Sequence, residues 1–104
     1  MNTSTVETGF PTATNAAVND LTLAVDLSDG RTISVPVAWY PRLVNGTPAE
    51  RKHWRLIGAG IGLHWPDLDE DISVENLLLG RPSGESQSSL KQWLSQRAHQ
   101  QPDG

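Results

Sequence analysis

An acidic run, Asp67-Leu68-Asp69-Glu70-Asp71, is the part of the sequence whose residue types and spacing are most suited to chemistry. Carboxylates at alternate positions are typical of the first half of a calcium-binding loop. Such a loop needs glycine at its sixth position and a bidentate acid at its twelfth, where this sequence has Ile72 and Leu78. We therefore expect no metal site, and we expect the acids to lie in a solvated turn or to pair with arginines.

Acid–base and nucleophilic chemistry find little support in the same region. Two catalytic carboxylates require that one be desolvated, which a polar turn does not provide. A metal-assisted or hydrolytic enzyme using His64 and Asp67 is nevertheless one alternative that the spacing leaves open. In an alternating strand, His64 would face the side opposite to Ile61, Leu63 and Trp65, which favours a solvent-facing histidine. No Gly-x-Ser-x-Gly elbow is present to supply an activated serine.

The glycine-rich segment 58–62 does not have the context of a phosphate loop. It follows an expected helix and precedes an expected strand, the reverse of a dinucleotide fingerprint, so we interpret it as a tight helix-to-strand connection. The sequence contains no cysteine, which excludes disulfides, thiolate zinc sites and cysteine nucleophiles. Together these features predict a protein that is not an enzyme and that holds no cofactor.

Charge is unevenly distributed along the 104 residues, whose formal net charge is −4. Residues 31–55 are rich in arginine, and residues 67–75 are rich in aspartate and glutamate. The net charge weighs against non-specific nucleic-acid binding, because such binding relies on neutralising phosphates. No apolar run approaches the roughly 20 residues that span a bilayer, and the N-terminus lacks the pattern of a signal peptide. We expect a cytoplasmic protein with no membrane contact.

The elements that must position these residues begin with a β-hairpin. Leu21, Leu23, Val25 and Leu27 alternate with polar or small residues, and a second alternating run covers 32–37. The turn between them, 28–30, ends in glycine, which tolerates the positive φ of a tight hairpin. Residues 1–16 precede this pattern and are expected to form a disordered tail.

Helical and extended segments follow in short pieces. Thr47-Pro48-Ala49-Glu50 predicts a helix start with a capping box, and this helix is expected to continue through Trp54 until Gly58. Ser73 and Gly80 are expected to cap a helix over 74–79. The predicted fold is a small α+β domain with a β-hairpin, two short helices, a third strand and C-terminal helices. Its expected parts are a tail at 1–16, a core domain at 17–80, a linker at 81–87, an amphipathic helix at 88–98 and a tail at 99–104.

Four stretches together resemble a bacterial family, the domain of unknown function family 2442. They are Trp39-Tyr40-Pro41-Arg42-Leu43, the helix start Thr47-Pro48-Ala49-Glu50, the glycine-rich turn from Trp54 to Ile61, and the run from His64 to Glu75. The likeness extends over about residues 18–97. The resemblance implies a small β-hairpin-plus-helix domain. Some relatives carry a further DNA-binding domain, for which this chain is too short, and some are encoded beside small toxin-like proteins. The resemblance carries no catalytic residue to this chain.

The leading functional hypothesis is therefore a non-enzymatic binding or regulatory module that acts through protein–protein contact in an antitoxin-like way. A nucleic-acid-associated transcriptional regulator using the basic helix is the first alternative. In the last helix, Leu90, Trp93 and Leu94 form an apolar stripe that either docks on its own domain or binds another chain. Homo-oligomerisation also stays open. The expected partner-contact residues are Arg42, Arg51, Arg55, Asp69, Glu70, Asp71 and Trp93.

Overall fold

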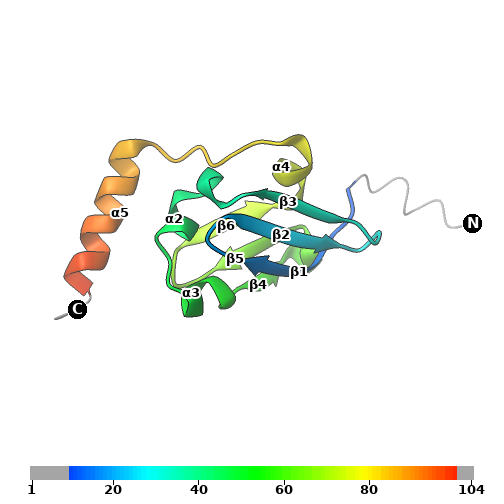
Figure 1. Cartoon of the computed structure of the whole chain (residues 1–104), viewed down its shortest axis with the longest axis horizontal. Helices are drawn as coiled ribbons and strands as arrows, with labels where there is room; N and C mark the ends of the chain where they lie inside the picture. Colours follow the sequence, from blue (N-terminus) through cyan, green and yellow to red (C-terminus); the bar gives the residue numbers. More distant parts are fainter. Residues whose placement is uncertain (1–9, 101–104) are drawn as a thin grey trace, which may run out of the picture.

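Two three-stranded antiparallel sheets form the frame of the protein in a computed structural model that describes residues 10–100. Figure 1 shows them as two layers, with short helices at the ends of the layers and the last helix beside them. The first sheet has the order β1-β2-β3, with strands Ala13–Val18, Thr22–Leu27 and Thr32–Pro36. The second has the order β4-β5-β6, with strands Arg55–Ile57, Gly62–Trp65 and Glu70–Ser73. The α+β class predicted from the sequence is confirmed.

The predicted hairpin is the pair β2–β3. Leu23, Val25 and Leu27 of β2 are buried, while the residues between them are half-buried. In the register, Val25 lies opposite Ile33. The strand β3 ends at Pro36, as expected of a residue that cannot donate to the ladder.

The first strand, β1, corrects the prediction that residues 1–16 form a tail. Ala13–Val18 pairs with the open edge of β2, and Ala13 and Ala16 are buried. Alanine, threonine and asparagine give this segment no hydrophobic alternation of its own, so its pairing depends on the edge that the hairpin offers. Residues 1–9 lie outside the described residues.

Short helices connect the two sheets. A 3₁₀ turn, η1 (Val37–Trp39), precedes α2 (Pro41–Val44) and α3 (Pro48–Lys52). The capping box is confirmed: the Thr47 hydroxyl accepts from the Glu50 amide, and the Glu50 carboxylate accepts from the Thr47 amide. The helix was expected to continue through Trp54, but it ends at Lys52, because the next residues become β4 and pair with β5 from Arg55 onward.

The second sheet positions His64 and the acidic run. Leu63 and Trp65 of β5 are fully buried and His64 faces the other side, as predicted. Ile61 precedes the strand and is 64% exposed, so it does not share the face of Leu63 and Trp65. It follows the turn η2 (Gly58–Gly60), which joins the antiparallel strands β4 and β5, so the predicted helix-to-strand connection is wrong. Asp71 and Ile72 belong to β6.

Two helices complete the described chain. Val74–Leu79 forms α4, with the Ser73 hydroxyl accepting from the Asn76 amide and Gly80 in the left-handed conformation, as predicted. The last helix, α5, spans Gln87–Gln100 and is longer than the predicted 88–98. Two residues of the predicted tail at 99–104 thus belong to the helix, and 101–104 lie outside the described residues.

One hydrophobic cluster lies between the layers. Its fully buried side chains are Leu23, Val25, Leu43, Leu63, Trp65, Leu68 and Val74. Trp93 of α5 joins the same cluster with 9% of its surface exposed, and Leu90 and Leu94 pack against it. The last helix therefore docks on its own domain, the first of the two outcomes that its apolar stripe allowed. Over residues 10–100, none of the helices has the length and apolar character needed to cross a bilayer.

Candidate functional site

Arg42 of α2 joins three distant parts of the chain. Its Nε and Nη2 donate to the Glu85 carboxylate at 2.9 and 2.6 Å, and its Nη1 donates to the Asp69 carbonyl at 3.1 Å. Its guanidinium carbon lies 4.9 Å from the centre of the Trp93 ring. Hydrogen bonds from Arg42 lower the pKa of Glu85, and Glu85 in turn raises the pKa of Arg42. Three predicted contact residues, Arg42, Asp69 and Trp93, are therefore brought together.

Arg97 holds the other end of α5. Its Nη2 and Nη1 donate to the Glu50 carboxylate at 2.9 and 3.2 Å, and its guanidinium carbon lies 4.8 Å from the centre of the Trp93 ring. Glu50 also caps α3, so one carboxylate links two helices. The hydrogen bonds from Arg97 are the main cause of the lowered pKa of Glu50. Trp93 is thus fixed by two guanidiniums, which suit the negative face of an aromatic ring.

Arg51 is placed inside the domain rather than on the predicted contact surface. It is 8% exposed, and its guanidinium donates to the carbonyls of Leu43 and Val44 at 2.8 and 3.1 Å and to Asp20 at 2.8 Å. Arg55 is exposed on β4, opposite His64 in the register. The two arginines therefore do not form the basic helical surface that was expected.

The acidic run is divided between the solvent and the interior. Asp67 and Asp69 lie in the β5–β6 turn and are exposed, and Asp71 points outward from β6. Glu70 turns inward, and its Oε2 is buried without a hydrogen-bond partner. Burial raises the pKa of Glu70 to about 7, against the opposing effect of Arg42. The predicted solvated turn is therefore correct for the aspartates and wrong for Glu70.

Tyr40 is the buried neighbour of this carboxylate. Its side chain is 4% exposed and its hydroxyl has no partner among the described residues. Burial, and then the nearby charge of Glu70, raise the pKa of Tyr40 to about 12. Glu70 and Tyr40 both line a cavity of about 140 Å³. Desolvation is thus the largest cause of the raised pKa of both groups.

The histidines pair with different acids from the pair considered in the sequence. The His53 Nδ1 lies 2.7 Å from an Asp67 carboxylate oxygen, and the His64 Nδ1 contacts Asp71. His64 and Asp67, the two residues of the hydrolytic alternative, thus have separate partners. In the part of the chain that the structure describes, no three His, Cys, Asp or Glu side chains lie together in a way that would hold a metal ion.

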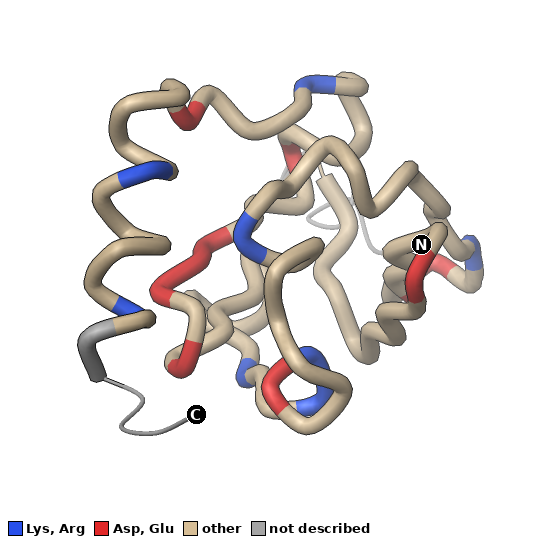
Figure 2. The backbone as a smooth tube through the Cα atoms, turned by 60° about the vertical axis from the view of Figure 1, so that its left-hand side comes forward, with Lys and Arg blue, Asp and Glu red and all other residues tan. Residues whose placement is uncertain are grey.

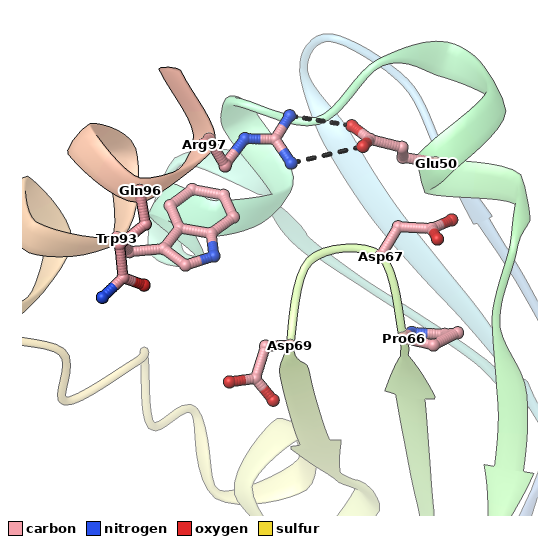
Figure 3. Close-up of a pocket in the computed structure, with 7 residues that line it drawn as sticks. All are labelled: Glu50, Pro66, Asp67, Asp69, Trp93, Gln96 and Arg97. Atoms are coloured by element: carbon pink, nitrogen blue, oxygen red, sulfur yellow. Dashed lines mark hydrogen bonds and ion pairs between the residues drawn. The ribbon is translucent and has the colours of Figure 1, made fainter. Parts of the chain in front are cut away.

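A hollow of about 400 Å³ opens between α5 and the β5–β6 turn, and we call it the α5 groove. Figure 3 shows Trp93 and Gln96 on the helix side, with Asp67 and Asp69 on the turn opposite. Figure 2 shows the acidic segment of the turn facing the helix. The residues that line the α5 groove are Glu50, Pro66, Asp67, Asp69, Trp93, Gln96 and Arg97.

Of the residues that line the α5 groove, Asp69 and Trp93 were predicted from the sequence as contact residues. Glu50 and Asp67 also line the groove and were not predicted as contact residues. Glu85, which fixes Arg42 from 43 positions away, was likewise not predicted. Arg97 carried a signal, because it shares the helical face of Trp93. No local signal identified Glu85, since its partner is set by how the linker crosses the domain.

Comparisons with known proteins agree on the fold and leave the chemistry open. A family model described as "Protein of unknown function (DUF2442)" matches residues 16–83. A crystal structure of a protein of unknown function from Rhodospirillum rubrum is 28% identical over 74% of this chain and 95% of that chain, with a TM-score of 0.64. An uncharacterized protein from Chromobacterium violaceum is 18% identical over 86% of this chain and 82% of its own, with the same TM-score of 0.64, and supports the fold alone. No curated protein matches.

Proposed function

Because this chain belongs to the family described as "Protein of unknown function (DUF2442)", whose description names no reaction, we propose that it is a non-enzymatic binding module acting through protein–protein contact at the α5 groove. The observation that carries the proposal is the groove itself. It is an open hollow of about 400 Å³ with a fixed tryptophan on one wall and exposed carboxylates on the other. Because only 9% of Trp93 is exposed, the groove offers a partner the edge of its ring beside the carboxylates.

The way α5 is attached supports a recognition role. Trp93 is positioned by two guanidiniums, each of which is held by a carboxylate on a different element. A partner therefore meets an ordered wall, and the entropy of ordering it has already been lost on folding. A regulatory, antitoxin-like role is one form of this proposal. It places the module in the cytoplasm, which a sequence without cysteine allows.

The nucleic-acid alternative receives no comparable support from the described residues. Phosphate binding needs arginines whose donors are free. The guanidiniums of Arg42 and Arg51 are instead occupied by carboxylates and backbone carbonyls of the protein itself. Arg55 is exposed on β4, but it is separated from Arg51, which is buried. The α5 groove carries three carboxylates against one guanidinium, which would repel a phosphate backbone.

A site-specific crosslink tests the proposal. We would place benzoylphenylalanine at Gln96, which is exposed and lines the groove, and, as the control, at Ser34, which is exposed on β3 of the other sheet. Irradiation in the native host should give one crosslinked protein from position 96 and none from position 34. The captured protein would then be purified and its affinity for the unmodified chain measured by calorimetry. Equal crosslinking at both positions, or no affinity between the purified proteins, would refute the proposal.

A further inference from the structure

We propose that the α5 groove binds an extended peptide segment of the partner that carries an arginine or lysine, with its cation on Asp67 and Asp69 and a backbone carbonyl on the Trp93 indole N–H. This inference rests on the proposed function and specifies the chemistry of the partner. It follows from two independent features of the groove, its carboxylates and its unpaired indole donor. Each feature selects a different part of a basic peptide.

The carboxylates of the β5–β6 turn have acceptor capacity left for a cation. The Asp69 side chain is 85% exposed, and its closest cation, Arg42 Nη1, lies at 3.6 Å, beyond hydrogen-bond distance. Asp67 uses one oxygen for His53 and is 41% exposed. An ionised carboxylate has about four lone-pair sites, so both groups can accept further hydrogen bonds. A guanidinium or ammonium is the donor that a pair of exposed carboxylates prefers.

Glu50 and Arg97 leave this acidic pair uncompensated. The two ions bridge α3 and α5 and satisfy each other at 2.9 Å, with side chains only 19% and 16% exposed. Figure 3 shows their paired hydrogen bonds running from α5 to α3, and neither bond involves an aspartate. The charge of Arg97 is therefore already neutralised within the protein. An approaching ligand meets Asp67 and Asp69 as an excess of negative charge, which selects a cation by complementarity.

Trp93 supplies the second feature. Its side chain is more than nine-tenths buried, with 9% exposed, and two guanidiniums lie over its ring. Among the described residues the indole N–H donates no hydrogen bond, and its nitrogen is not one of the buried atoms left without a partner, so it opens to the hollow; Figure 3 shows it on the edge of the ring that faces the hollow. By contrast, the buried Trp65 indole donates to the Arg51 carbonyl at 3.0 Å. The Trp93 donor is therefore free to bind a ligand that enters the hollow.

An extended peptide satisfies both requirements in one ligand. Its backbone offers a carbonyl acceptor to the indole N–H, and its side chains project away from the backbone toward the aspartates. A bare cation would leave the indole donor unpaired, and an anion would be repelled by the carboxylates. A volume of about 400 Å³ is also within the range of clefts that bind ligands.

The decisive measurement is the indole resonance of Trp93 in a ¹H–¹⁵N spectrum of the full chain, assigned with Trp93→Phe. The probe is a blocked pentapeptide of alternating glycine and arginine, and its control has citrulline, the neutral isostere, in place of arginine. We expect the arginine peptide to shift the Trp93 resonance saturably. The citrulline peptide should bind at least about tenfold more weakly, because a hydrogen bond to an ionised partner is lost.

Matched variants separate recognition from folding. Asp67→Asn with Asp69→Asn should weaken the arginine peptide by about tenfold or more. Glu75→Gln, which removes an exposed acid of α4 outside the groove, should leave the affinity unchanged. A Trp93 resonance that does not move, or equal affinity for the two peptides, would overturn this inference. If the partner crosslinks at position 96 but the arginine peptide does not displace it, the proposed function stands and the basic-segment inference fails.

Discussion

Glu70→Gln should abolish a pH dependence of stability that the buried carboxylate imposes on the wild-type protein. Burial raises the pKa of Glu70 from 4.5 to about 7. Between these values the folded state keeps a proton that the unfolded state releases, so the stabilisation from that proton is complete below pH 4.5 and is lost as the pH rises through 7. The shift corresponds to about 3 kcal/mol of unfolding free energy, at about 1.4 kcal/mol per pKa unit. Glutamine has the same shape and stays neutral throughout.

The assay is urea unfolding followed by tryptophan fluorescence, from about pH 5 to 8. Work below that range would mix in Glu50 and Glu85, whose pKa values are lowered by arginines and whose stabilisation disappears on acidification. We expect the free energy of unfolding of Glu70→Gln, minus that of the wild type, to increase by about 2–3 kcal/mol over this range. Glu75→Gln, which replaces an exposed acid of α4, should show no such increase.

The result that would refute this reasoning is a constant difference between Glu70→Gln and the wild type at every pH. That outcome would mean that Glu70 keeps an ordinary pKa, because Arg42 compensates for its burial. A difference that decreases with pH would go further, since it would show that the ionised carboxylate stabilises the fold. The carboxyl carbon of Glu70, followed by nuclear magnetic resonance, should titrate near pH 7 and would report the same pKa independently.

Three further substitutions test how the site is positioned. Trp93→Ala should lower the free energy of unfolding by about 2–4 kcal/mol and release α5, seen as faster amide exchange in that helix, whereas Lys91→Ala on its exposed face should change little. Arg51→Ala should lower the free energy of unfolding, measured with urea, by about 2–4 kcal/mol, because it leaves two carbonyls without donors. A loss below about 0.5 kcal/mol would show that the Arg51 guanidinium is not needed for stability. Gly60 and Gly30 have similar positive φ values, +97° and +94°, so alanine is strained at both positions. Only at position 60 would the added Cβ also meet backbone, 2.9 Å from the Ala13 carbonyl oxygen. Gly60→Ala should therefore lower the melting temperature more, and equal losses would show that the close approach to β1 does not matter.

The sequence alone determined the elements whose physics is local. The alternation in β2 and β3 predicted the hairpin, because a period of two places every second side chain on one face of a strand. The capping box of Thr47 and the cap of α4 by Ser73 were also predicted from the sequence, because donor and acceptor are only three residues apart. The family resemblance was also available from the sequence, and it is confirmed.

Only the tertiary structure decided which residues face the candidate site. Arg51 and Arg55 looked equivalent in the sequence, yet one is buried and the other exposed, because α3 ends between them and the chain turns into β4. Glu70 and its neighbours Asp69 and Asp71 looked like one acidic surface. The alternation of β6 sends Glu70 inward, and this direction depends on the register with β5.

The α5 groove itself depends on contacts that no local pattern encodes. Arg42 meets Glu85 from 43 positions away, and Arg97 meets Glu50 from 47 positions away. Pairing over such separations is fixed by how the linker and the last helix cross the domain. The apolar stripe on the last helix predicted that Trp93 must pack somewhere. Where it packs, and that its indole N–H faces an acidic hollow, depends on the tertiary contacts of the whole helix, including those ion pairs.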